Sequence, residues 1–203
     1  TLLLSSVLES VKIPVVAAGG FRDGSGLAAS LAWGADGIAM GTRFMMTQES
    51  PVPKNTKEAY LSAAVEDIKI TKKFDGLSHR LIFNNYIKKI DRSNPMSLFI
   101  MSISSAWKYK KLTKASYADL TKSFIAMLKG DDLTISQSIM SANSPAIIQK
   151  AMVEGSPDEG AMPSGQVAGL ISNLPTCKEL IDEIMREFTS AVANLRSIDG
   201  DKL

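Results

Sequence analysis

Two glycine turns, each following a short apolar segment, constrain the fold of this chain more than any other feature. The apolar segments are predicted strands at residues 13–18 and 36–40, and an Ala- and Leu-rich predicted helix lies between them at 24–33. The first segment does not alternate with polar residues, which predicts a strand covered on both faces. The order of strand, turn, helix, strand and turn predicts an α/β fold with two consecutive parallel strands.

The ends of these two strands carry residues that suit an anion. Gly19 and Gly20 follow the first strand, and Gly41 and Thr42 follow the second. Because glycine has no Cβ, an anion can approach the backbone N–H groups of such a turn closely. In (β/α)8 barrels a phosphate is often bound beyond strands seven and eight. One glycine turn is a weak signal, but the two together predict a phosphate site.

The rest of the chain is predicted to be mainly helical. Asn55 and Glu58 form a capping-box pattern, which predicts a helix that runs to about residue 64. Residues 67–72 are rich in β-branched side chains and predict a short strand. Thr176 and Glu179 repeat the capping-box pattern at the start of the last helix. The other predicted elements are helices at 116–128 and 144–153 and a glycine-rich loop at 155–169.

Composition and charge argue against several classes of protein. The chain has 203 residues, with 23 Lys and Arg against 21 Asp and Glu, so no basic excess predicts a nucleic-acid partner. Cys177 is the only cysteine, which excludes an internal disulfide and makes a cysteine-based zinc site unexpected. No apolar run is long enough to cross a membrane. We therefore expect a cytoplasmic protein with no membrane partner and no metal site.

The chain begins inside a predicted element. Residues 1–11 are predicted to form an amphipathic helix that leads directly into the first strand, and residue 1 is Thr1. Because a natural N-terminus seldom falls inside a packed βα repeat, we expect this sequence to be the C-terminal part of a longer chain. The remainder of that chain is then the expected partner that completes the sheet.

Three segments, at 13–21, 23–24 and 34–44, combine two strand ends with glycines, and this combination is more specific as a motif than either glycine turn alone. They closely resemble the nitronate monooxygenase family, formerly called 2-nitropropane dioxygenases, which includes FMN-dependent enoyl-acyl-carrier-protein reductases. The resemblance implies a (β/α)8 TIM barrel, of which this chain would form the C-terminal portion, strands 7 and 8, with a helical extension. The implied domains are the end of an FMN-binding barrel at 1–66 and a mainly helical lid at 67–203. The segments 57–64, 76–84 and 164–171 also resemble the family, and the resemblance is weakest across 85–150.

The resemblance also implies a cofactor and the residues that bind it. The family's catalytic base is a histidine on an earlier strand, and no matching motif occurs here, so no catalytic residue is expected in this chain and the base is expected upstream of Thr1. His79, the only histidine, matches a region in which the family's histidine is not the base. The cofactor is FMN, and the residues implied to bind it are Ala18, Gly19, Gly20, Ala39, Met40, Gly41, Thr42 and Gln166.

The expected function is oxidation of alkyl nitronates with dioxygen by an FMN-dependent oxidoreductase. One alternative is an NAD(P)H-dependent enoyl-thioester reductase, which shares these motifs with the first function. A barrel that binds phosphate without flavin and a non-catalytic fragment are alternatives from other classes. The expected partners are a small-molecule substrate and either dioxygen or NAD(P)H. The sequence leaves open whether the protein forms a homodimer.

Two further residues are predicted to have structural roles. Arg43 follows the second turn and is expected to form an ion pair with a barrel carboxylate such as Asp36. Cys177 lies at the start of the last helix, where the helix dipole favours a thiolate, but no base accompanies it in the sequence. Neither residue is expected to take part in catalysis.

Overall fold

The computed structural model describes residues 2–75, 77–94, 97 and 135–198. The chain divides into two compact units, one formed by Thr1–Ser50 with Gly165–Leu203 and the other by Pro51–Ser164. These units follow contacts within the chain, and the functional division into 1–66 and 67–203 stays a prediction. The helix predicted at 116–128 lies outside the described residues.

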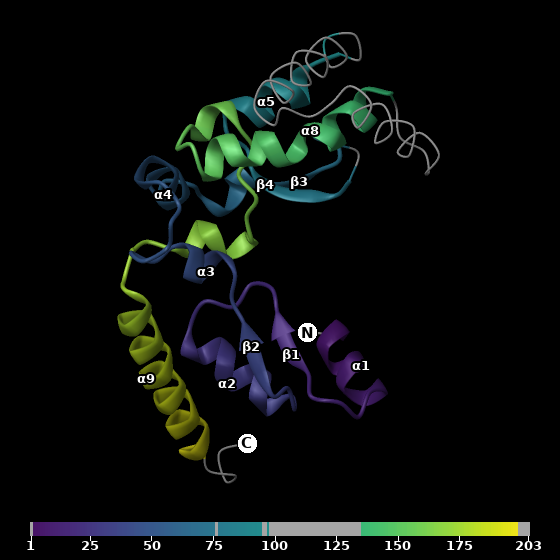
Figure 1. Cartoon of the computed structure of the whole chain (residues 1–203). Coiled ribbons are helices and arrows are strands. Elements are labelled where there is room, and N and C mark those ends of the chain that lie inside the picture. Colours follow the sequence, from purple (N-terminus) through teal and green to yellow (C-terminus); the bar gives the residue numbers. More distant parts are fainter. Residues whose placement is uncertain (1, 76, 95–96, 98–134, 199–203) are drawn as a thin grey trace. The chain divides into compact units, whose positions relative to one another are not determined.

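The first unit contains the predicted strand–helix–strand order, which confirms the α/β class. Strands β1 (Val16–Ala18) and β2 (Gly37–Ala39) are parallel and pair residue for residue along their whole length. Helix α2 (Gly24–Ala32) connects them and packs against β2 and against the long helix α9 (Cys177–Arg196), as Figure 1 shows. The same unit contains α1 (Leu2–Ser10), the one-turn helix α3 (Thr42–Met45) and the 3-10 helix η3 (Gln166–Leu170).

The start of α2 lies against the backbone of α9. Asp23 caps α2, since its Oδ1 accepts the N–H of Gly26 at 2.9 Å. A Cβ placed on Gly24 would lie 2.1 Å from the carbonyl oxygen of Ile184, so only glycine permits this approach. The N–H of Gly24 donates to Glu187 Oε2 at 2.8 Å. The two helices are therefore joined at a contact that leaves no room for a side chain.

The prediction that the first strand is covered on both faces is wrong for the described residues. Ile13 is 71% exposed and Val16 is 58% exposed, whereas Ala17 is buried. Within the described ranges β1 pairs with β2 alone, and these two strands form the whole sheet of this unit. A two-stranded sheet cannot bury both faces of its strands, so apolar side chains remain open to solvent.

The second unit is built on an antiparallel hairpin. Strand β3 (Ile68–Thr71) confirms the short strand expected at 67–72, and it pairs with β4 (His79–Ile82), which the sequence analysis did not predict. Phe74 and Leu81 belong to the buried apolar cluster of this unit. The remaining elements, seen in part in Figure 1, are α4 (Lys54–Leu61), η1 (Val65–Asp67), α5 (Asn85–Arg92), α8 (Ile135–Met152) and η2 (Pro157–Glu159).

The capping box expected at Asn55 and Glu58 is wrong, whereas the one at Thr176 and Glu179 is confirmed. Helix α4 begins earlier, with Pro53 at the N-cap position and no side-chain cap. Pro53 has φ of −57° and an extended ψ of 148°, so the first helical residue is Lys54, one residue ahead of Asn55. The Asn55 side chain instead reaches the carbonyl oxygen of Gly155, at 3.5 Å.

A buried hydroxyl joins two segments of the second unit. Tyr60 is fully buried, and its hydroxyl donates to the carbonyl oxygen of Pro163. Burial raises the pKa of Tyr60 above its ordinary value, so the hydroxyl keeps its proton. We expect Tyr60→Phe to lower the free energy of unfolding by about 1–2 kcal/mol, because the carbonyl would lose its donor. Urea unfolding would measure this, and equal stability of the two proteins would contradict it.

Candidate phosphate-binding site

The strand register brings the two predicted glycine turns level with each other. Ala18 lies opposite Ala39 at the ends of β1 and β2, and both strands run in the same direction. The next residues along each strand therefore leave the sheet at one edge. We call the four residues that follow there, Gly19, Gly20, Gly41 and Thr42, the phosphate cradle.

The backbone of the cradle has a conformation that favours glycine. Gly19 has φ of +102° and Gly20 has φ of +81°, in the left-handed region that side chains rarely tolerate. A Cβ placed on either residue, or on Gly41, would meet nothing within 4 Å. In the described part of the chain, the amides of Gly19 and Gly20 donate to no other residue. The cradle thus presents unused donors to open space, as an anion site requires.

The flanking candidates lie at the same edge. Ala18 and Ala39 are exposed at the strand ends, and Met40 is half-buried beside them. Within the described ranges these residues lie on an open edge, and none of them lines the pocket beside Arg43. Their predicted contact with a cofactor stays a prediction.

Thr42 connects the cradle to a segment far along the chain. Its Oγ1 accepts the N–H of Gly165 at 2.9 Å, which leaves the hydroxyl hydrogen available for an acceptor. Gln166, the eighth predicted cofactor residue, is the next residue after Gly165 and is exposed. The tertiary structure therefore brings the Gln166 segment beside the end of β2, as the proposed site requires.

The expected ion pair between Asp36 and Arg43 is wrong. Asp36 precedes β2, and its Oδ2 accepts the N–H of Val15 at 2.7 Å. Arg43 follows β2, and its Nη2 donates to Oδ1 of Asn173 at 2.9 Å. The strand separates the two residues, so their side chains lie at opposite ends of it. Sequence proximity alone could not place Arg43 against a partner 130 residues away.

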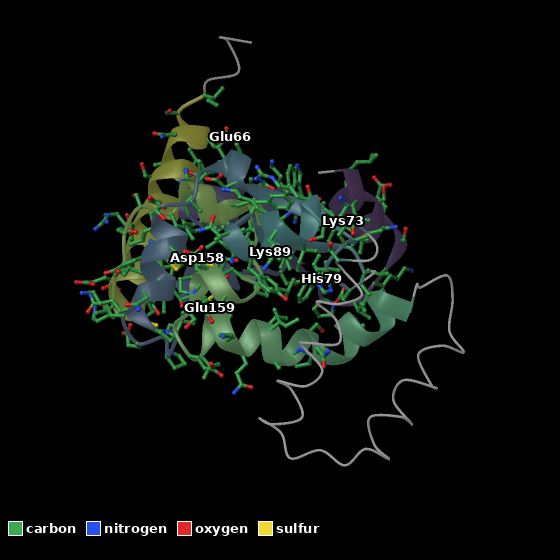
Figure 2. All side chains as sticks on the ribbon, turned by 90° about the horizontal axis from the view of Figure 1, so that it is seen from above. Glu66, Lys73, His79, Lys89, Asp158 and Glu159 are labelled. Atoms are coloured by element: carbon green, nitrogen blue, oxygen red, sulfur yellow. The ribbon has the colours of Figure 1, made fainter. Side chains whose placement is uncertain are left out.

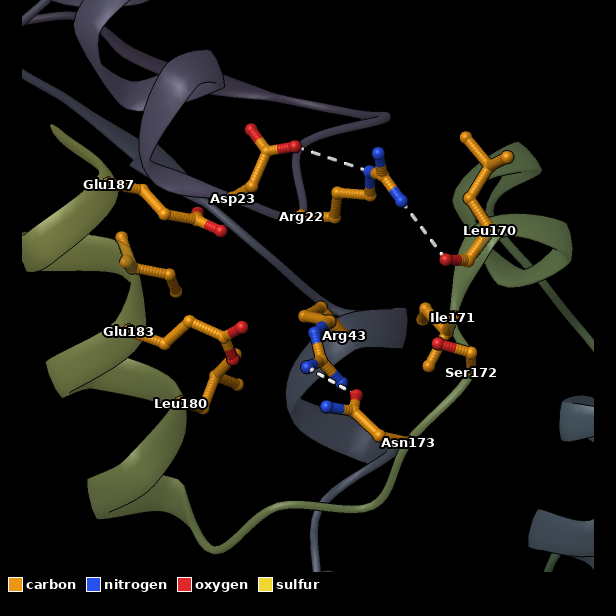
Figure 3. Close-up of a pocket in the computed structure, with 11 residues that line it drawn as sticks. Arg22, Asp23, Arg43, Leu170, Ile171, Ser172, Asn173, Leu180, Glu183 and Glu187 are labelled. Carbon is orange, nitrogen blue, oxygen red and sulfur yellow. Dashed lines mark hydrogen bonds and ion pairs between the residues drawn. The ribbon is translucent and has the colours of Figure 1, made fainter. Parts of the chain in front are cut away.

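Arg43 is a residue of this region that the sequence analysis undervalued. Its side chain is only 6% exposed, and in the described chain its Nη1 has no hydrogen-bond partner. It lines a pocket of about 170 Å³ with Glu183 and Glu187 on α9, as Figure 3 shows. Burial lowers the pKa of Arg43, and the negative charges of Glu183 and Glu187 oppose that shift. Glu183 and Glu187 are four residues apart, a spacing that places both carboxylates on one face of a helix, where they can attract a cation.

His79 and Cys177 both lie in structural contacts. His79 belongs to the second unit (Figure 2), with Nε2 2.8 Å from Oδ2 of the buried Asp75. Asp75 also accepts the N–H of Leu77, at 3.0 Å, so it organises the turn of the hairpin. Cys177 is the first residue of α9, and its Sγ lies 3.5 Å from Thr47 Oγ1.

Two kinds of feature are absent from the described part of the chain. No group of His, Cys, Asp and Glu side chains there could hold a metal ion. Of the helices with described residues, none is both long enough and apolar enough to cross a bilayer.

Known proteins resemble the chain along most of its length. It is 46% identical over 187 residues to the (3aS,4S,5R,7aS)-5-hydroxy-7a-methyl-1-oxo-octahydro-1H-indene-4-carboxyl-CoA dehydrogenase of Rhodococcus jostii (strain RHA1), covering 92% of this chain and 53% of the relative. The structure of FabK from Thermotoga maritima superposes with a TM-score of 0.65 at 27% identity, over 98% of this chain and 51% of that one. Nitroalkane oxidase from Streptomyces ansochromogenes gives a TM-score of 0.62 at 27% identity, over 96% and 44%.

The chain thus spans about half the length of the relatives that it matches. The family model described as nitronate monooxygenase matches residues 1–187. This match includes the cradle, Arg43 and the Gln166 segment, and it confirms the resemblance carried by the two glycine turns. The chain belongs to the nitronate monooxygenase family.

Proposed function

We propose that this chain carries the phosphate-binding end of an FMN-dependent oxidoreductase of the nitronate monooxygenase type. The single observation that carries the proposal is the cradle, in which two glycine turns leave a parallel strand pair at one edge and the amides of Gly19 and Gly20 are unused by the described residues. In the finer proposal, β1 and β2 are strands 7 and 8 of a (β/α)8 barrel, where phosphates are commonly bound. The other strands would come from the remainder of the same protein.

The residues present suit the phosphate of FMN. The amides of Gly19 and Gly20 would donate from the first turn, and those of Gly41 and Thr42 from the second. The Thr42 hydroxyl, which already accepts from Gly165, would donate its own hydrogen. FMN, when bound, would supply the electron transfer, and the protein would supply binding and orientation. Ala18, Ala39, Met40 and Gln166 are proposed to flank the cofactor. The catalytic base is proposed to lie upstream of Thr1.

Two substrates are candidates for the whole enzyme. Alkyl nitronates, oxidised with dioxygen, follow from the family description. A carbon skeleton carried as a thioester is the second candidate, because the relative at 46% identity is named a carboxyl-CoA dehydrogenase. A dehydrogenase removes electrons from its substrate, so the reduction of an enoyl thioester by NAD(P)H would be the same electron transfer in the opposite direction, and it would replace nitronate oxidation.

The test begins with the cofactor. The purified protein is expected to be yellow, to absorb near ~450 nm, and to release FMN when it is denatured. Oxygen consumption with propyl nitronate would then support the first substrate, and NAD(P)H oxidation with a crotonyl thioester would support the second. A colourless preparation that fails to take up FMN would contradict the proposed function.

A further inference from the structure

We propose that Arg43 is a positioning residue that holds the Gly41–Thr42 turn in the geometry that binds phosphate, an inference that rests on the proposed function. Arg43 directly follows Thr42 and is buried to 6% exposure, although arginine is seldom buried unless it is paired. Its one recorded hydrogen bond among the described residues goes to Asn173, in the segment just before α9. The buried guanidinium therefore ties the cradle to a distant part of the chain.

The tie is one of several along a continuous seam, which we define as the contacts between residues 42–49 and residues 165–177. Thr42 is joined to Gly165 at 2.9 Å, and Arg43 to Asn173, also at 2.9 Å. Farther along, the N–H of Gln48 donates to the carbonyl oxygen of Pro175 at 3.0 Å. The N–H of Cys177 donates to both carboxylate oxygens of Glu49, each at 2.9 Å. Of these links, the one between Arg43 and Asn173 is made by the charged side chain of the residue that directly follows the cradle.

Helix α9 lies across the pocket from the guanidinium of Arg43. Helix α9 is held against α2 at Gly24, where no side chain fits, and Glu187 is bonded to the N–H of that glycine. Glu183 lies one turn earlier on α9 and lines the same pocket as Arg43 (Figure 3). Both carboxylates line the same pocket as the guanidinium and attract it electrostatically. Asn173 then sets the direction of the guanidinium through its hydrogen bond.

Loss of the Arg43 contact should weaken only the binding of the FMN phosphate. The amides and the hydroxyl of the Gly41–Thr42 turn bind an anion only if they point at it, and a hydrogen bond weakens steeply as its angle departs from linear. The turn contains no group proposed to contact the isoalloxazine ring. Releasing Arg43 should therefore weaken binding of FMN and leave binding of riboflavin, which lacks the phosphate, unchanged.

Asn173→Ala tests this with little risk to folding, because Asn173 is exposed and only its side chain is shortened. We expect the Kd for FMN to rise about tenfold, as for loss of one hydrogen bond to a charged group, with no change in the Kd for riboflavin. Flavin fluorescence titration of the apoprotein measures both constants without any assay of activity. Asn173→Asp keeps an acceptor oxygen and should retain the preference for FMN.

Gln48→Ala is the matched control, since it removes another seam bond, from Nε2 to the carbonyl oxygen of Leu174 at 3.1 Å. It should leave both Kd values unchanged, and an equal loss in this variant would overturn the role of Arg43. If the wild-type protein prefers FMN and Asn173→Ala keeps the full preference, the inference fails while the proposed function stands. If the wild-type protein binds FMN no more tightly than riboflavin, the cradle does not bind the phosphate. That result would contradict both the inference about Arg43 and the proposed function.

Discussion

Gly20→Ala is expected to weaken the binding of FMN by about 10- to 100-fold, which is the loss of one or two hydrogen bonds to a charged group. Gly20 has φ of +81°, and a Cβ at this position would extend into the open space in front of the cradle. The added methyl group would occupy space that the phosphate needs, and relaxation of the strained turn would redirect its amides. Fluorescence titration with FMN gives the change in Kd.

Gly34→Ala is the matched control for backbone strain. Gly34 has φ of +101°, a Cβ there also meets nothing within 4 Å, and the residue follows the far end of α2. An alanine in the left-handed region costs about 1–2 kcal/mol of stability at either position. Both variants should therefore lose stability, but only Gly20→Ala should lose affinity for FMN. Equal affinities for FMN in the two variants would show that the cradle does not bind the phosphate.

Gly24→Ala is expected to lower the free energy of unfolding by about 3 kcal/mol, at the upper end of the cost of overpacking a core. A Cβ would lie 2.1 Å from the carbonyl oxygen of Ile184 and 2.3 Å from the backbone nitrogen of Phe188. Both contacts are with the backbone of α9, so no rotamer change can relieve them. The helices would have to separate, which would also stretch the bond from Gly24 to Glu187. Urea denaturation measures the change.

Gly37→Ala adds the same methyl group where nothing lies within 4 Å of it, so it serves as the control. Its stability should stay close to that of the wild-type protein. A stability loss of the same size in both variants would mean that the α2–α9 contact is not the cause. Because Glu183 and Glu187 lie on α9, we also expect Gly24→Ala to disturb the surroundings of Arg43.

Local rules were sufficient for much of the fold and for naming the four residues of the cradle. Apolar segments ending in glycine predicted β1, α2 and β2 in the right order, and the Thr176–Glu179 capping box marked the start of α9 correctly. These signals depend on residues within one helical turn of each other, which a sequence displays directly. The wrong prediction of a helix start at Asn55 is also a local matter, because Pro53, two residues earlier, is the N-cap of α4.

That two glycine turns end two parallel strands could be read from the residues alone, since glycine content, apolar runs and spacing are local properties. The distant groups that meet those turns, such as Gly165 at Thr42 and Asn173 at Arg43, depend on the tertiary fold. The tertiary fold also leaves Val16 of β1 exposed, together with Ile13, which precedes that strand. The physical reason is that contacts across more than a hundred residues depend on how whole helices pack, and no short pattern encodes that packing.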